Sequence, residues 1–149
     1  MKKVLKIILA TMLFIFIAIQ FYQPAPNVDK GQVYPADFTQ LNKMPVEIKA
    51  MFQTSCYDCH SNNTNYVWYD YVQPARILAE NHIKKAKEDL NFNEWGTYSN
   101  RKQERLLNSI KEQIKTKQMP LSSYTLMHNN AKLNDVQIKV LTNWLEQQE

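Results

Sequence analysis

Apolar residues follow two different patterns along the chain. Residues 4–22 form a nearly continuous apolar run, with Lys6 and Gln20 as its main polar interruptions. From residue 45 onward, apolar residues recur at helical spacing with polar residues between them, which is the pattern of helices that bury one face. The sequence therefore predicts one isolated apolar helix followed by an all-α domain.

The apolar run has the length of a membrane-spanning helix. Its 19 residues would extend over about 28 Å as an α-helix, close to the hydrocarbon thickness of a bilayer. The unbroken part, residues 7–19, would also fit a signal peptide, but no Ala-x-Ala cleavage site follows it, and Ala25 is followed by Pro26. We therefore expect residues 1–22 to be a membrane anchor or uncleaved signal segment, with a cleaved signal as the alternative.

Lysines flank this run on its amino-terminal side. Lys2, Lys3 and Lys6 predict that this end stays in the cytoplasm, because basic residues favour the cytoplasmic side of a membrane. The rest of the chain would then lie on the extracytoplasmic, periplasmic face of a bacterial membrane. If the segment is cleaved, the product would be a soluble periplasmic domain.

The exported part divides into a linker and one helical domain. Residues 23–44 contain three prolines, one glycine and no periodicity, which is typical of a tether. Residues 45–149 would form the folded domain. The expected helices cover residues 45–55, 74–90 and 101–118, and a last segment that begins at a capping box of Asn134 and Gln137.

Composition and charge exclude several classes of protein. The chain has 149 residues, 44% hydrophobic and 11% aromatic, which suits one small ordered domain rather than a disordered chain. The formal net charge is +4, but without the three lysines at the amino end 15 basic and 14 acidic residues remain. A nearly neutral domain is unlike a nucleic-acid-binding protein, so we expect no nucleic acid partner.

Residues 56–60 read Cys-Tyr-Asp-Cys-His and form the most specific motif of the chain. A C-x-x-C-H run is typical of covalent haem c attachment. Thiols three positions apart on a helical turn can reach two vinyl groups on one edge of a porphyrin, and the adjacent histidine can then bind the iron. We therefore expect Cys56 and Cys59 to hold haem c and His60 to be an axial iron ligand.

Three other uses of the two cysteines compete with this interpretation. A thioredoxin-type redox pair should lie near a βαβ pattern, which the sequence lacks. A zinc site needs two further donors, and His82 and His128 are 46 positions apart, unlike a close histidine pair. A disulfide between Cys56 and Cys59 would close a very small, strained loop.

Met119 is the candidate for the second axial ligand. It precedes Pro120 at the end of the third expected helix, so its thioether can cross a haem face, and a methionine opposite a histidine raises the haem potential. Met119 could instead fill a gap in the core. The rival ligands are Met127, His128 and His82, the last on the apolar face of the second helix, where a core histidine is the commoner case.

Two further features fit a haem protein but also an ordinary one. Residues 81–118 carry nine basic and five acidic side chains, which form either a solvated face or a docking patch for an acidic redox partner. Arg76 could pair with a haem propionate or lie at the surface. The aromatic residues that could wall a haem, or simply belong to the core, are Tyr66, Trp68, Tyr69, Tyr71 and Trp95.

Together these motifs resemble the small bacterial haem-binding domain family of exported monohaem c-type proteins, over roughly residues 37–147. The resemblance implies haem binding, with Cys56, Cys59 and His60 in the family's haem motif and Met119 in its Met-Pro segment. The chain departs from the family at residues 73–76, where a more aromatic stretch is expected. The matching segments are CYDCHSN at 56–62, YVWYDYVQP at 66–74, LNFNEW at 90–95, MPLSSYTLMH at 119–128 and NWL at 143–145.

The sequence thus predicts a membrane-anchored, extracytoplasmic monohaem c-type cytochrome. Its small cytochrome c-like, all-α domain would surround one covalently attached haem c and pass single electrons to a redox partner protein, so that an electron carrier is favoured over an enzyme. The alternative is a haem enzyme, or a sensor of peroxide or small gases, with an open or labile sixth iron position.

Overall fold

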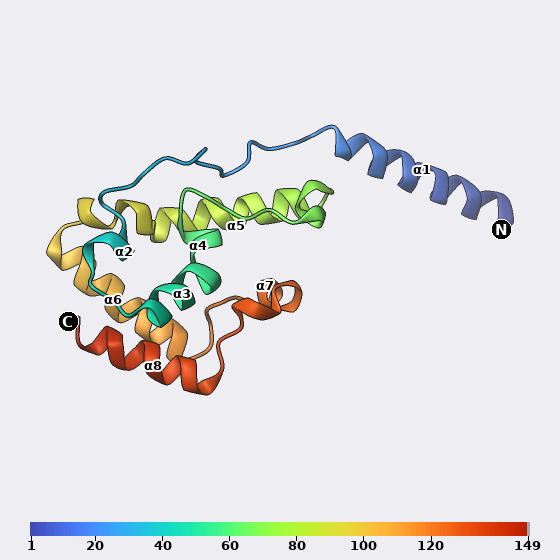
Figure 1. Cartoon of the computed structure of the whole chain (residues 1–149). Helices are drawn as coiled ribbons and strands as arrows, with labels where there is room; N and C mark the ends of the chain where they lie inside the picture. The colour runs from blue at the N-terminus through green and yellow to red at the C-terminus, as the bar shows by residue number, and fades with distance from the viewer. Residues whose placement is uncertain (149) are drawn as a thin grey trace.

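The computed structural model describes residues 1–148 and is all-helical, which confirms the predicted fold class (Figure 1). Within these residues no β-strand forms. The expected helices are present to within a few residues, and short helices that the periodicity did not reveal lie between them. The elements are α1 (Lys2–Gln20), α2 (Phe38–Leu41), α3 (Val46–Ser55), α4 (Tyr57–His60), the 3-10 helix η1 (Trp68–Tyr71), α5 (Ala75–Asp89), η2 (Phe92–Thr97), α6 (Asn100–Lys115), α7 (Ser122–Met127), η3 (Asn129–Ala131) and α8 (Asp135–Glu146).

The helix α1 projects away from the rest of the molecule (Figure 1). None of its residues is buried. It is long and apolar enough to cross a membrane, with a mean hydropathy of 2.1 over its most apolar window. An exposed apolar helix of this length can be either a membrane anchor or a signal sequence.

Phe38 lies at the centre of the domain core. Its side chain is fully buried, and its ring centroid lies 4.8 Å from that of Trp95 and 5.2 Å from that of Phe52, in edge-to-face contacts that favour aromatic pairs. The sequence places Phe38 in residues 23–44, the segment expected to be a tether. In the structure, residues 38–41 of this segment form α2, which packs into the core. The folded domain therefore begins before residue 45.

A close backbone approach holds α2 against η2. The Gly96 N–H donates to the carbonyl oxygen of Ala36 over 2.8 Å. A Cβ atom at residue 96 would lie 2.6 Å from Cδ1 of Leu41 and 3.3 Å from Cα of Ala36. Only a residue without a side chain leaves this contact undisturbed.

The helices α6 and α8 pack on each other beside this core. The predicted capping box at the start of α8 is confirmed, since Asn134 and Gln137 exchange two hydrogen bonds of 2.9 Å. The α6 helix begins at Ser99, whose side chain accepts from the backbone N–H of Lys102. The buried residues of the pair are Leu106, Leu107 and Ile114 in α6 and Leu141, Trp144 and Leu145 in α8.

Candidate functional site

The Cys-Tyr-Asp-Cys-His motif forms a single helical turn between α3 and α5. Cys56 ends α3, where its N–H donates to Phe52 over 2.9 Å, and its own carbonyl accepts from the N–H of His60 over 3.0 Å. The two cysteines and the histidine are therefore positioned by one turn of backbone, as the motif predicts.

The two residues between the cysteines fix this turn in the domain. The hydroxyl of Tyr57 donates to the buried carboxylate of Asp37, 3.1 Å away, and its ring stacks on Phe92 with centroids 5.0 Å apart. On the other side, Asp58 accepts from the hydroxyl of Tyr124 in α7 over 2.7 Å. The Asp58–Tyr124 bond was not predicted, because nothing in the sequence pairs residues 66 positions apart.

The ring of His60 is oriented by the end of α5. Its Nδ1 lies 3.1 Å from the carbonyl oxygen of Ala86 and 3.0 Å from that of Leu90. Carbonyl oxygens only accept, so Nδ1 carries the proton and Nε2 keeps its lone pair. Burial lowers the pKa of His60 below its ordinary value, although the two backbone bonds oppose the shift. The side chain is thus a neutral imidazole with one nitrogen available to a metal, and such a carbonyl partner is usual for ligating histidines.

Both cysteine thiols are free, and both residues are partly buried. Burial raises the pKa of Cys56 to about 12 and, with help from the charges of Asp58 and Asp70, raises the pKa of Cys59 to about 11. A thioredoxin-type pair instead lowers the pKa of its attacking thiol with positive or helix-dipole surroundings. The surroundings of these thiols therefore do not support the redox-pair interpretation.

Two adjoining cavities bring the predicted site residues together. Cys56, His60 and Met119 line both the larger cavity, of about 350 Å³, and the second cavity, of about 250 Å³. Cys59 and Pro120 line the second one. Two thiols, an imidazole and a thioether therefore border one continuous region, and this donor set fits a covalently held haem.

Met119 reaches these cavities from the end of α6. Its N–H donates to the carbonyl oxygen of Gln113 over 3.1 Å, and the same carbonyl accepts from Gln118 over 2.9 Å. These bonds end the helix and fasten the Met-Pro segment to its last turn. Met119 is 59 positions from His60 in the sequence, yet the two residues line the same cavities.

Two of the three rival ligands, Met127 and His128, lie outside the two cavities that His60 borders. Met127 and His128 line an outer hollow, which also contains Cys59 and His82 but not His60. His128 stacks on Tyr124 with ring centroids 4.1 Å apart. The expectation that His82 is a core histidine is wrong, because its side chain is exposed and its Nδ1 contacts only the Leu78 carbonyl of its own helix. Of the rivals, His82 alone shares a cavity with His60.

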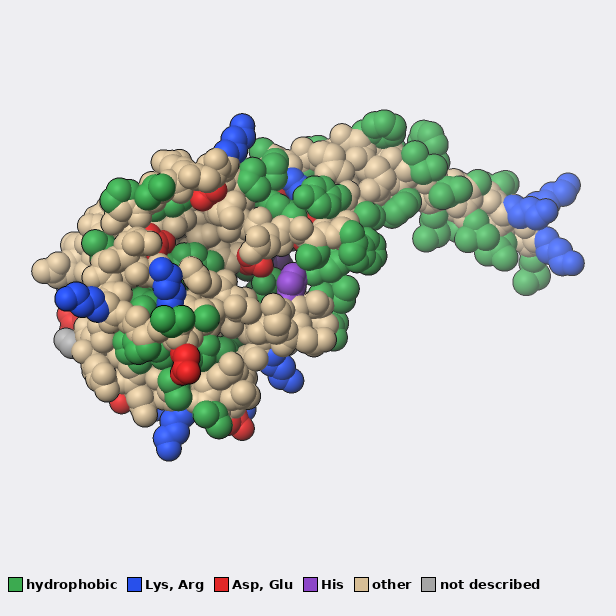
Figure 2. All heavy atoms as spheres, viewed as in Figure 1, with side chains coloured by type: hydrophobic (Ala, Val, Ile, Leu, Met, Phe, Trp, Pro, Cys, Tyr) green, Lys and Arg blue, Asp and Glu red, His purple; other side chains and the backbone are tan. Residues whose placement is uncertain are grey.

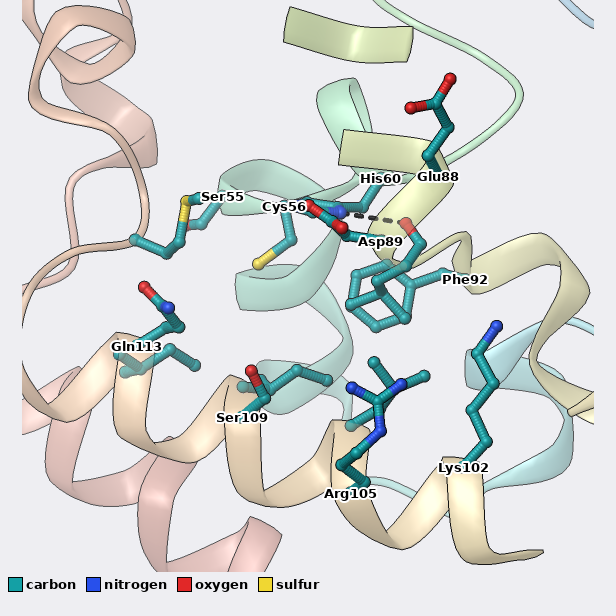
Figure 3. Close-up of a pocket in the computed structure, with 15 residues that line it drawn as sticks. Ser55, Cys56, His60, Glu88, Asp89, Phe92, Lys102, Arg105, Ser109 and Gln113 are labelled. Atoms are coloured by element: carbon teal, nitrogen blue, oxygen red, sulfur yellow. Dashed lines mark hydrogen bonds between the residues drawn. The ribbon is translucent and has the colours of Figure 1, made fainter. Parts of the chain in front are cut away.

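A polar stripe of α6 forms one wall of the larger cavity (Figure 3). Lys102 and Arg105 rise from this helix towards the cavity, and Lys102 Nζ lies 3.6 Å from the centroid of the Tyr98 ring. In the sequence these residues stand out only as part of the basic stretch 81–118. Their spacing was the available signal, because Lys102, Arg105, Ser109 and Gln113 share one helix face beside the apolar one.

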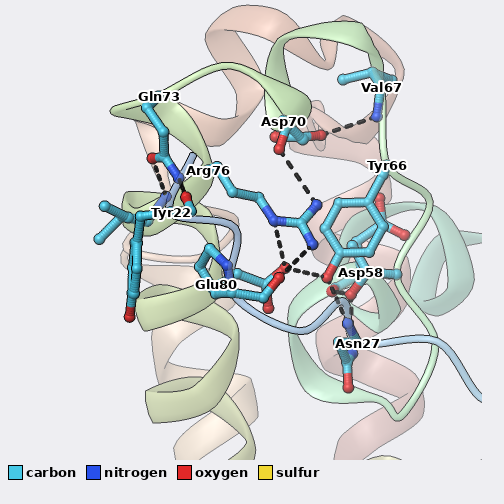
Figure 4. A network of polar contacts seen from close by, with 12 residues as sticks. Tyr22, Asn27, Asp58, Tyr66, Val67, Asp70, Gln73, Arg76 and Glu80 are labelled. Carbon is cyan, nitrogen blue, oxygen red and sulfur yellow. Dashed lines mark hydrogen bonds and ion pairs between the residues drawn. The ribbon is translucent and has the colours of Figure 1, made fainter. Parts of the chain in front are cut away.

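Arg76 does not belong to this site. It is 3% exposed and forms an ion pair of 3.4 Å with Glu80, so it is neither a surface residue nor a lining residue of the cavities (Figure 4). Trp95 belongs to the core, whereas Trp68 and Tyr71 are exposed. Of the predicted aromatic set, Tyr66 and Tyr69 line the outer hollow.

The remaining interpretation of the cysteines is a metal site without haem. Across residues 1–148, no three His, Cys, Asp or Glu side chains come together closely enough to hold a metal ion. A zinc site requires at least that many protein ligands, so these residues do not supply one by themselves.

Comparison with known proteins agrees with the donor set. No curated protein and no solved structure matches the chain. The family model of the haem-binding domain matches residues 14–147, which include the motif, the Met-Pro segment and all of the domain helices. This match confirms the predicted resemblance: the chain belongs to the haem-binding domain family.

Proposed function

We propose that this protein is a membrane-anchored, extracytoplasmic monohaem c-type cytochrome that carries single electrons. The observation that carries the proposal is that Cys56, Cys59, His60 and Met119, from two distant parts of the sequence, border the same pair of adjoining cavities. Haem binding itself is shared with the family. Covalent attachment of the haem, electron transfer and membrane anchoring go beyond the family match and belong to this proposal.

Each residue of the donor set has a distinct role in this proposal. Cys56 and Cys59 would hold the haem through thioethers, and His60 would bind the iron through Nε2, the nitrogen left free by its backbone bonds. Met119 would bind on the opposite face. The cations Lys102 and Arg105, which line the larger cavity, would pair with the haem carboxylates.

The surroundings of His60 suit an electron carrier. When bound, the haem supplies a reversible one-electron change at its iron. The carbonyl oxygens of Ala86 and Leu90 fix the imidazole in one tautomer and orientation, so the ligand need not rotate or exchange a proton when the charge changes. Phe92 shields the histidine from the core side, with ring centroids 6.1 Å apart. The redox partner would dock through a small, transient interface.

The location follows from α1. Its length, its apolarity and the absence of buried residues within it are those of a helix that needs an apolar environment. Lysines at its amino end favour a cytoplasmic amino terminus and an exported domain. An exported domain would lie outside the cytoplasm, where covalent haem attachment normally takes place. A soluble periplasmic protein would result if the segment were removed as a signal.

A second candidate function is a haem enzyme or a sensor of peroxide or small gases. The observation in its favour is the outer hollow, where His82 and His128 lie beside Cys59. His128 is also within 3.2 Å of the Tyr69 hydroxyl. Such side chains could assist proton transfer at an open iron position.

One set of spectra tests both functions. The full chain is purified in detergent with its haem, and its visible spectrum is recorded oxidised, reduced and reduced with carbon monoxide. An electron carrier should keep its haem after denaturation, show six-coordinate low-spin iron and not respond to carbon monoxide. Haem that is released on denaturation contradicts covalent attachment, and high-spin iron that binds carbon monoxide supports the second function.

A further inference from the structure

The carboxyl end of α1 is hydrogen-bonded to the domain. Gln20 and Gln73 exchange two bonds: the Gln73 N–H donates to Gln20 Oε1 over 2.9 Å, and Gln20 Nε2 donates to the Gln73 carbonyl over 3.3 Å. Gln73 is 1% exposed, and its side-chain amide donates to the carbonyl of Tyr22. The segment that leaves the apolar helix is therefore attached to Gln73, two residues before α5.

A buried arginine extends this attachment (Figure 4). Arg76 Nη2 donates to the carbonyl oxygen of Pro24 over 2.9 Å, and its guanidinium lies 4.8 Å from the centroid of the Tyr66 ring. Glu80 balances its charge at 3.4 Å. Because hydrogen bonds to charged groups inside a protein are stronger than neutral ones, residues 20–24 have a defined position on the domain.

Exposed apolar side chains gather on the edge of the domain next to this attachment. Figure 1 shows the amino end of α5 and the helix α7 on the side from which α1 projects, and Figure 2 shows hydrophobic side chains continuing from α1 onto this edge. We call these residues the η1–α7 patch. Its members and their exposed fractions are Trp68 76%, Tyr71 58%, Val72 38%, Leu78 57%, Leu126 75% and Met127 56%.

The patch has the chemistry of a bilayer interface. Tryptophan and tyrosine are enriched where the hydrocarbon of a membrane meets its headgroups, because their rings are apolar and their N–H or O–H groups are polar. Asp70 is the charged residue of η1, and it is buried, where its carboxylate accepts from the Val67 N–H over 2.9 Å. The sequence of α7, SSYTLM, contains no charge. Contact between this edge and lipid would therefore not remove water from any solvent-exposed charged group of η1 or α7.

We propose that the η1–α7 patch lies in the headgroup region of the same bilayer that α1 spans, so that the domain rests on the membrane in one orientation. This inference rests on the proposed anchoring by α1, but not on the haem chemistry. The continuity of the patch with α1, through the Gln20–Gln73 pair, favours lipid over a second copy of the chain or another protein. In this orientation α8 lies on the side of the domain away from α1 (Figure 1).

Labelling from within the membrane tests the orientation. The full haem-loaded chain is reconstituted in phosphatidylcholine vesicles that contain a phospholipid with a photoactivatable diazirine close to its headgroup, and the labelled peptides are mapped by mass spectrometry. We expect label in α1, in residues 66–72 and in residues 122–128. The α8 peptide with Val136 and Val140, which are 72% and 41% exposed, is the internal control and should stay unlabelled.

Matched variants show whether the label reports the patch. The double variant Trp68→Ser/Leu126→Ser should lose label in residues 66–72 and 122–128 while α1 keeps it. Val136→Ser is the control, because Val136 is exposed to the same degree as Leu126 but lies on α8, and it should change nothing. The visible spectrum of each variant shows separately whether the haem site is intact.

The possible results separate the two proposals. Label in α1 without label in the patch leaves the anchor standing and overturns the resting orientation. If the patch stays unlabelled and the reconstituted chain is a dimer, the patch belongs to an interface between two copies, and the inference is overturned as well. If α1 itself carries no label, both the anchoring and the orientation are wrong, whatever the haem spectrum shows.

Discussion

The Nδ1 atom of His60 lies 3.0 Å from the carbonyl oxygen of Leu90, the residue that ends α5. This contact joins the cysteine motif to the end of α5 and, together with the contact to Ala86, decides which imidazole nitrogen is available. It also places the histidine beside Phe92 of the core. The orientation of the His60 ring therefore depends on contacts with α5 and the core, and not on the cysteine motif alone.

Replacing His60 by glycine should remove the proximal ligand without removing the thiols. We expect the haem to stay covalently bound but to lose its six-coordinate low-spin spectrum, and added imidazole should restore it by filling the space that the side chain leaves. The measurement is the visible spectrum with and without imidazole. His82→Gly is the matched control, since His82 is exposed on α5. A low-spin spectrum in His60→Gly without imidazole would exclude His60 as ligand.

Met119→Ala should lower the reduction potential, within the roughly 0.8 V range over which axial ligands set it. It should also allow carbon monoxide to bind the reduced protein. Potentiometric titration and the carbon monoxide spectrum measure the two effects. Met127→Ala is the control, because Met127 lines only the outer hollow. If Met127→Ala shifts the potential and Met119→Ala does not, the ligand assignment is reversed.

Phe38→Ala should cost about 3–5 kcal/mol of unfolding free energy, as for other large aromatic residues removed from a core. The reason is the loss of packing against Phe52 and Trp95, together with the cavity left behind. Chemical denaturation of the full chain in detergent, followed by circular dichroism, measures the loss. Val46→Ala, at a position 84% exposed, should change stability by no more than about 0.5 kcal/mol. Equal effects of the two variants would mean that α2 is not part of the core.

Glu80→Gln should leave the charge of Arg76 buried without its carboxylate. Breaking such a pair from one side costs about 3–5 kcal/mol, and here the arginine side chain is 4% exposed. The double variant Arg76→Met/Glu80→Leu should recover much of this loss, because no charge then remains. Denaturation midpoints of the three proteins give the comparison. A double variant as unstable as Glu80→Gln would show that the pair matters for shape rather than charge.

Stability should fall in alkaline solution, partly through Tyr66. Burial, and then its hydrogen bond to Glu80, raises the pKa of this phenol from 10 to about 12. The folded protein therefore holds the proton more tightly than the unfolded chain, so this contribution is complete below pH 10 and is lost as the pH rises towards 12. The loss measured between these two pH values should be smaller in Tyr66→Phe. The exposed Tyr71→Phe serves as the control, and an unchanged loss in Tyr66→Phe would contradict the assignment.

The long helices could be predicted from the sequence because their apolar faces repeat and their ends carry proline, serine or a capping box. The short elements could not, since α2 and η2 are too short to show a helical repeat of apolar residues, and contacts between distant residues such as the Gly96–Ala36 bond hold them in place. Phe38 was assigned to a tether because its neighbours show no periodicity. Nothing local reveals that its ring fills the core.

In the site too, features that depend on neighbouring residues could be predicted, and features that depend on contacts between distant residues could not. The cysteine motif lies within five residues, so its chemistry could be predicted directly. The two carbonyl partners of His60 and the Asp58–Tyr124 bond depend on the fold. Arg76 was expected at the surface or on a propionate because a single basic residue gives no sign of burial. Arg76 can be buried because Glu80 and the Pro24 carbonyl bind its guanidinium, and the sequence does not show these contacts.

The fastening of Met119 to the last turn of α6 has a consequence for the order of assembly. In the proposed cytochrome, the thiols and the imidazole of residues 56–60 are contiguous in sequence, so they would be available to a haem before the domain has folded. Met119 is 59 positions away and lies at the same cavities through the end of α6, where its N–H is bonded to the Gln113 carbonyl. Met119 would therefore be able to hold the haem only in the folded domain, whereas the residues of the motif would not need the rest of the fold.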